Sequence, residues 1–267
     1  MPGNVYFELT RAFNAAAPIA ALASGQAVVY YRIAIMSKDG DWVIRETEAA
    51  CAHILHVLAA RGAAYRPGAP LDRRWLAGGW SSHFEFMDDK ERRVRCDFFS
   101  RPPRVSRQSL ERLFATAVDP LLVIDLESLI RMKLTQRAKD YVIIGELAAR
   151  LPPPLEVRFT TDPDRLLALA PLHASASMRE AVRAAAAGSR DAVVVALARE
   201  RDAQQRTDRA RVDAYAAAAA SYLAAFVRLA AAERRLPAAH PRVIALAERL
   251  LPPAVRLPGD DSDGDAE

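Results

Sequence analysis

The sequence is poor in cysteine and has no long uninterrupted apolar run. Its two cysteines, Cys51 and Cys96, stand far apart among apolar neighbours. Isolated thiols of this kind are more typical of small buried side chains in a reducing compartment than of a disulfide framework. We therefore expect a cytoplasmic protein. No run approaches the roughly 18 apolar residues that a membrane span requires, and the first residues lack the basic-then-apolar pattern of a secretion signal. We therefore expect no membrane partner.

Basic residues slightly outnumber acidic ones, 37 to 33, although the C-terminus is acidic. The net charge is +4, yet residues 259–267 contain five acids and no base. Residues 257–267 are predicted to form a disordered acidic tail. The rest of the chain is more basic than the net charge suggests. This favours polyanionic partners such as nucleic acid or nucleotide phosphates, unless the arginine-rich, alanine-rich composition merely reflects a GC-rich genome.

Two carboxylates stand one residue apart where an apolar, β-favouring segment begins. Asp39 and Asp41 precede Trp42-Val43-Ile44, and on a strand they would share a face, about 7 Å apart along the chain. Like charges on one strand face repel each other, so the pair requires a reason. One reason is a bound divalent cation. The other is a polar turn, since Gly40 tolerates positive φ and aspartates cap backbone amides.

A third carboxylate favours the cation over the turn. Residues 82–87 and 92–100 are two alternating segments separated by a polar turn, which is typical of a β-hairpin. Asp97 lies on the second of these segments, on the face opposite Cys96 and Phe98.

Two further segments have features that suit phosphate binding. Residues 19–23 are apolar, Ser24-Gly25 follows, and a helical pattern begins at Gln26; in this geometry backbone amides and the helix dipole receive a phosphate. Residues 126–151 form a helical pattern. If they are one helix, Lys133, Arg137 and Asp140 share a face, which would be either a phosphate-binding face or an exposed face with an ion pair.

This order of parts resembles the DNA polymerase β-type nucleotidyltransferase superfamily, and within it the bacterial minimal nucleotidyltransferases that include the AbiEii-type abortive-infection toxins. The resemblance covers roughly residues 5–151. It depends on the combination of four motifs: Ser24-Gly25, Ser37-Lys38-Asp39-Gly40-Asp41, Cys96-Asp97, and Lys133 followed by Arg137-Ala138-Lys139-Asp140.

The resemblance implies an α+β fold with a mixed sheet flanked by helices, and a magnesium or manganese site. Asp39 and Asp41 would ligate both metal ions, and Asp97 would ligate one and orient the attacking group. Ser24, Gly25 and Ser37 would hold the phosphates of an NTP, which Lys133 and Arg137 would reach from the far side. Asp140 would only orient Arg137 and Lys139.

Two departures from the family pattern leave an inactive homologue open. Ser24 precedes Gly25 where the family usually has Gly-Gly or Gly-Ser. Gly40 replaces the usual apolar residue between the acids, and we expect it to make the strand more flexible.

Beyond Pro154 the chain becomes alanine-rich. We expect a nucleotidyltransferase-like domain over residues 1–153 and a helical bundle domain over 154–256. Two or three long helices should cover residues 177–235, with breaks at Gly188 and Pro237 and a last helix from Pro241.

Two functions follow from these features. The first is a metal-dependent nucleotidyltransferase that moves a nucleoside monophosphate from an NTP to a hydroxyl of RNA, protein or a small molecule. It could belong to a toxin–antitoxin pair, with an antitoxin or a second copy binding the helical domain. The alternative is a catalytically degenerate binding module for nucleic acid or a protein partner.

Overall fold

The computed structural model describes residues 3–257, so the predicted acidic tail lies outside the described residues except for Leu257. The chain forms two compact units. Unit 1 consists of Met1–Ile124 and Asp213–Glu267, and unit 2 consists of Asp125–Val212.

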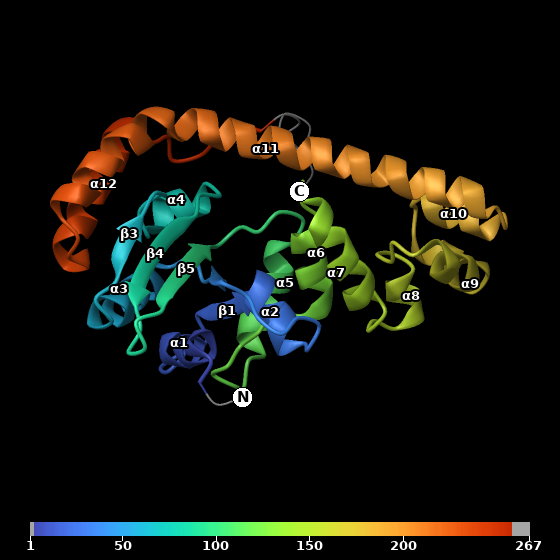
Figure 1. The fold of residues 1–267 in the computed structure, drawn as a ribbon, viewed down its shortest axis with the longest axis horizontal. Helices are drawn as coiled ribbons and strands as arrows, with labels where there is room; N and C mark the ends of the chain where they lie inside the picture. The colour runs from blue at the N-terminus through green and yellow to red at the C-terminus, as the bar shows by residue number, and fades with distance from the viewer. Residues whose placement is uncertain (1–2, 258–267) are drawn as a thin grey trace. The chain divides into compact units, whose positions relative to one another are not determined.

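Unit 1 contains a five-stranded mixed sheet (Figure 1). The strands are β1 (Ala20–Ala23), β2 (Asp39–Ile44), β3 (Ala64–Arg66), β4 (Ser82–Met87) and β5 (Arg93–Phe99). Their order across the sheet is β1-β2-β5-β4-β3, and only β2 and β5 run parallel. The predicted α+β class, with a mixed sheet flanked by helices, is confirmed. The predicted hairpin is β4–β5.

One face of the sheet is apolar and carries the core of unit 1. Trp42 stacks on Phe98 with ring centroids 5.3 Å apart, and Phe13 meets both rings edge-on. Burial of aromatic side chains at alternate strand positions fixes which face points inward. The helices between the strands are α1 (Val5–Phe13), α2 (Ser24–Tyr30), α3 (Glu48–Ala60) and α4 (Arg73–Ala77), and α5 (Arg107–Ala115) follows the sheet.

The C-terminal helices complete the same core. Tyr222 and Phe226, one turn apart on α11 (Arg190–Ala232), are fully buried in the cluster that includes Tyr65 of β3. Helix α12 (Leu236–Leu250) lies beside β3 and α3 (Figure 1). The expected start of this helix at Pro241 is wrong. The helix begins at Leu236, because Pro237 occupies its first turn, where a missing N–H costs nothing, and Pro241 is accommodated inside it.

Unit 2 is helical. It contains α6 (Leu126–Lys133), α7 (Ala138–Ala148), α8 (Pro153–Glu156), α9 (Pro163–His173), a 3-10 turn (Ala174–Ala176), α10 (Glu180–Ala186) and the first part of α11. Its core includes Val157, Leu166, Val182 and Val193. The division between the units does not coincide with the predicted domain limits at 153 and 154, because residues 213–257 pack on the sheet. Those limits stay a prediction.

The two or three helices expected over residues 177–235 are α10 and the 43-residue α11, separated at Gly188, which has a φ of +79°. One window of α11 is long and apolar enough, by length and composition alone, to cross a membrane. A single helix of this kind is weak evidence for a membrane span.

Candidate active site

The three predicted carboxylates share one face of the sheet in unit 1. Asp41 of β2 is the register partner of Asp97 on the parallel strand β5, and Asp39 is the partner of Arg95. Register partners on neighbouring strands lie about 4.8 Å apart in the hydrogen-bonding direction and point to the same face. Asp41 and Asp97 are therefore neighbours, with Asp39 two residues earlier on the same strand.

Gly40 is a packed position, in contrast to the flexible one that the sequence suggested. A Cβ atom built at residue 40 would collide with the rings of Tyr6 and Trp42. The Tyr6 hydroxyl donates a hydrogen bond to the carbonyl oxygen of Lys38 at 2.6 Å, which fixes the start of β2. Burial raises the pKa of Tyr6 to about 12, so this hydroxyl remains a donor. Glycine is needed here so that two aromatic rings can approach the backbone between the acids.

Basic side chains already contact two of the carboxylates. Oδ1 of Asp97 lies 3.2 Å from Nη1 of Arg66 and 2.8 Å from Nδ1 of His83. Oδ1 of Asp39 lies 3.6 Å from Nη1 of Arg95, beyond hydrogen-bond distance. In residues 3–257 no group of three His, Cys, Asp or Glu side chains is gathered closely enough to hold a metal ion. As the side chains stand, Asp97 is paired with Arg66, and Asp39 has only a longer-range contact with Arg95.

The donor set nevertheless fits a hard divalent cation. Magnesium and manganese prefer carboxylate oxygens, and three carboxylates lie on one sheet face. Oδ1 of Asp39 is inaccessible to solvent and accepts no hydrogen bond from the described residues. A buried carboxylate oxygen without a donor is costly, and a cation would satisfy it. Metal binding would require Asp97 to turn away from Arg66 and His83.

The predicted phosphate turn adjoins the first aspartate. Helix α2 begins at Ser24, directly after β1, and Ser24 adopts a positive φ of 46°. A Cβ atom at Gly25 would collide with Oγ and Cβ of Ser37. Ser37 in turn donates a hydrogen bond to the carbonyl oxygen of Asp39 at 3.3 Å. The structure thus brings the turn, Ser37 and Asp39 together, and only glycine fits at residue 25.

A cavity of about 670 Å³ opens beside the start of β2. Its lining includes two acids, Asp39 and Asp88, and four basic side chains: Lys38, Arg92, Arg93 and Arg95. Arg92 is held by Asp88 at 2.7 Å, and Arg93 lies 3.9 Å from Glu85. The cavity therefore combines room for a small ligand with an excess of positive charge.

Lys133 and Arg137 lie in unit 2, where both converge on Asp140. Nζ of Lys133 is 3.3 Å from Oδ1 of Asp140, and Nε of Arg137 is 2.8 Å from Oδ2. The Thr135 hydroxyl donates to the same carboxylate at 2.8 Å. Lys133 and Asp140 are buried. The expected role of Asp140 was to orient Arg137 and Lys139. The contact with Arg137 favours the first half of that role, which stays a prediction, and the second cation at Asp140 is Lys133.

Residues 126–151 are not one helix, since α6 ends at Lys133 and α7 begins at Ala138, so the condition for a shared helix face is not met. The linker is held by side chains that compete with helical hydrogen bonds. Oγ1 of Thr135 accepts the backbone N–H of Arg137, and Oδ2 of Asp208 accepts that of Gln136. The three charged residues meet through this turn and do not share one helix face.

Sequence reasoning missed the two partners of Asp97. His83 is its register partner on β4, and Arg66 is the partner of His83 on β3. The alternation of residues 82–87 could have placed His83 on the polar face. Strand β3 has only three residues, too few for a periodic signal, so Arg66 could not have been found in this way.

Comparisons with known proteins return two solved structures. No family model and no curated protein matches the chain. A crystal structure of a candidate nucleotidyltransferase from H. pylori is 10% identical, with a TM-score of 0.40, covering 77% of this chain and 94% of that one. The crystal structure of JHP933 from Helicobacter pylori is 9% identical, with a TM-score of 0.40, covering 78% of this chain and 93% of that one.

Proposed function

We propose that the chain is a metal-dependent nucleotidyltransferase, which moves a nucleoside monophosphate from an NTP to a hydroxyl acceptor. The observation that carries the proposal is the parallel register of Asp41 with Asp97, with Asp39 on the same sheet face. Nucleotidyl transfer needs charge neutralisation and positioning more than covalent help from the protein. Magnesium or manganese held by these three carboxylates would supply that neutralisation.

The reaction forms a bond between the acceptor oxygen and the α-phosphorus of the NTP, and breaks the bond from that phosphorus to the oxygen that leaves with pyrophosphate. Asp97 would orient the acceptor hydroxyl, whose proton passes to a carboxylate or to water. Ser24, Gly25 and Ser37 would hold the phosphates beside Asp39, and the basic cavity at Lys38 and its neighbours suits a polyanion. Lys133 and Arg137 are assigned to phosphate by the family resemblance alone.

The biological setting of this proposal is a cytoplasmic enzyme that acts on RNA, protein or a small molecule. An AbiEii-like toxin role, with an antitoxin or a second copy as partner, is the finer form of the proposal. Its support is the resemblance of the motifs around Asp39, Asp97 and Lys133.

A catalytically degenerate binding module is the second candidate. It is favoured by the contacts of Asp97 with Arg66 and His83, which occupy a carboxylate that the enzyme would need for metal. Such a module would bind nucleic acid in a steeply salt-dependent way through its basic surface, independently of the aspartates.

Label transfer distinguishes the two candidates. Purified protein is incubated with Mg²⁺, each of the four α-³²P-labelled NTPs and a cell lysate, and labelled RNA and protein are counted. We expect transfer by the wild type and by Asp89→Asn, a matched control whose exposed carboxylate lies in the β4–β5 turn. Asp41→Asn should lose at least about 100-fold, the scale of removing one transition-state electrostatic contact. If no NTP gives labelled product, or if Asp41→Asn transfers as much label as the wild type, the proposed nucleotidyltransferase activity is contradicted.

A further inference from the structure

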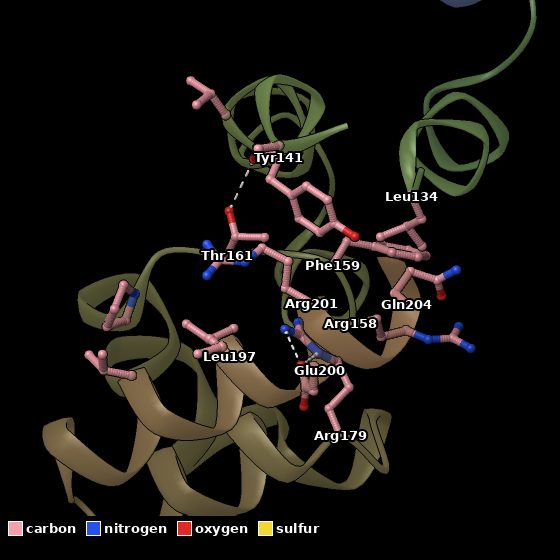
Figure 2. Close-up of a pocket in the computed structure, with 15 residues that line it drawn as sticks. Leu134, Tyr141, Arg158, Phe159, Thr161, Arg179, Leu197, Glu200, Arg201 and Gln204 are labelled. Atoms are coloured by element: carbon pink, nitrogen blue, oxygen red, sulfur yellow. Dashed lines mark hydrogen bonds and ion pairs between the residues drawn. The ribbon is translucent and has the colours of Figure 1, made fainter. Parts of the chain in front are cut away.

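Two polar features outside the carboxylate face have no part in the proposed reaction. One is a cavity of about 660 Å³ in unit 2, which the guanidinium groups of Arg158 and Arg201 flank from opposite sides (Figure 2). Its positive charges therefore do not converge on one point. The other is His240 in unit 1, which joins helix α12 to the sheet at hydrogen-bond distance. The geometry at His240 sets a definite chemical requirement.

His240 links α12 to the edge strand of the sheet. Its Nδ1 atom lies 2.7 Å from the hydroxyl oxygen of Tyr65, the middle residue of the three-residue strand β3. The two rings are nearly parallel, with an interplanar angle of 5° and centroids 6.1 Å apart. Tyr65 is buried and His240 is half-buried, so the contact is largely shielded from water. A change in charge at His240 therefore acts where the helix meets β3.

A second hydrogen bond at the Tyr65 hydroxyl fixes the direction of the first. The backbone N–H of Leu71 donates to the same oxygen at 3.1 Å. A phenol has one proton, and since its oxygen already accepts from Leu71, that proton is given to His240. Nδ1 must then accept, which it can do only in the neutral imidazole whose proton is on Nε2. An imidazolium would leave the buried phenol proton without an acceptor.

The surroundings of this pair favour the neutral imidazole. Burial lowers the pKa of His240 below its ordinary value of 6.5, and the negative charge of Asp72 opposes that effect. Asp72 is itself paired with Arg74 of α4 at 3.1 Å, which weakens its attraction for an imidazolium. Burial also raises the pKa of Tyr65 above its ordinary value, so the phenol retains its proton.

Other titratable groups near the pair are neutral, exposed or already paired. Cys51 of α3 and Tyr222 of α11 lie near Tyr65, and because burial raises the pKa of each, both stay uncharged. On α12 itself, Arg242 is exposed and Glu248 is paired with Arg74 at 2.8 Å. Protonation of His240 would therefore place a positive charge beside largely neutral partners.

The backbone of α12 holds the first turns of the helix only weakly. The N-cap residue, Arg235, supplies no side-chain cap within the described residues, and Pro237 and Pro241 have no backbone N–H to donate. The helix is kept in place by its buried face, to which Ala239 and Val243 belong. His240 adds a polar contact to this apolar packing.

We propose that His240 is a pH-sensitive latch, which holds the first turns of α12 against β3 while its imidazole is neutral and releases them when the imidazole is protonated. Because the pKa in the folded protein lies below 6.5, the latch contributes its full stability above that pH, and the contribution is lost as the pH falls through the lowered pKa. The proposal is independent of nucleotidyl transfer, since Tyr65 points into the apolar core and not to the carboxylate face.

Hydrogen exchange of the full-length protein tests the latch. Amide exchange of residues 236–245 is followed by mass spectrometry at about pH 7.5 and about pH 5, with rates corrected for their intrinsic pH dependence and with α1 as the internal reference. In the wild type, protection of residues 236–245 should fall at least about tenfold relative to α1 at the lower pH. His240→Gln should not show this fall, because its amide oxygen accepts from the Tyr65 hydroxyl at both pH values. His56→Gln, which removes an exposed histidine of α3, should respond as the wild type does.

A second measurement does not depend on how a variant folds. An NMR titration of the wild-type imidazole should give His240 a pKa below 6.5 and the resonances of the Nε2–H tautomer. Equal loss of protection in the wild type and His240→Gln would overturn the proposal, as would no loss in the wild type or a loss that α1 shares equally. A measured pKa of 6.5 or higher would also overturn it.

Discussion

Removal of the Asp140 charge should loosen unit 2, because a buried lysine depends on it. The side chains of Lys133 and Asp140 are 8% and 2% exposed, and their charged atoms lie 3.3 Å apart. Asp140→Asn keeps the shape and the acceptor for Thr135 but leaves the ammonium uncompensated, which costs about 3–5 kcal/mol. Arg137 is 51% exposed, so its lost ion pair adds less than about 1 kcal/mol.

Amide hydrogen exchange of residues 126–148, followed by mass spectrometry, measures the loss of stability of this region. A global unfolding curve would mix the contributions of the two units. A loss of about 3 kcal/mol lowers protection roughly 100-fold. Glu146→Gln, on the exposed side of α7, is the control and should have no effect. The double variant Asp140→Asn with Lys133→Met should recover most of the protection, because the stranded charge is gone. Full protection in Asp140→Asn alone would refute this reasoning.

Three further variants test other parts of the structure. Phe226→Ala should lower the free energy of unfolding of unit 1, measured in urea, by about 3–5 kcal/mol. The neighbouring Val227→Ala, at a position that is 58% exposed, should change it by no more than about 0.5 kcal/mol. Equal effects of the two variants would show that α11 does not share the core. Gly25→Ala should abolish label transfer with the fold retained by circular dichroism, since its Cβ displaces the adjoining serine; unchanged transfer would remove the turn from the site. The hydrogen bond from Arg101 lowers the pKa of Glu46 below its usual 4.5, so this carboxylate stabilises the fold above that pH and the contribution is lost as the pH falls through the lowered pKa. In Glu46→Gln, the free energy of unfolding should therefore fall less steeply as the pH is lowered than in the wild type. An unchanged pH dependence at acid pH would count against the pairing of Glu46 with Arg101.

The sequence allowed prediction of features that repeat locally. Alternation of apolar and polar residues indicated strands around Asp41 and Asp97, and period two placed both carboxylates opposite the core. The α+β class followed from the resemblance of the motifs. That β2 and β5 are parallel neighbours is a long-range property, which no local pattern encodes.

The features that sequence reasoning missed depend on distant contacts. Arg66 reaches Asp97 only because the three-residue strand β3 joins the sheet. The break between α6 and α7 depends on Asp208, more than 70 residues away along the chain. Tyr222 and Phe226 are buried in one cluster with Tyr65 of β3, and no local pattern in residues 213–257 encodes that packing.

A crystal structure of the protein soaked with Mn²⁺ and a non-hydrolysable NTP analogue tests the central claim most directly. The account predicts an anomalous manganese peak held by Asp39, Asp41 and Asp97, with Asp97 released from Arg66. Absence of manganese from this sheet face, with Asp97 still bound to Arg66 and His83, would contradict it.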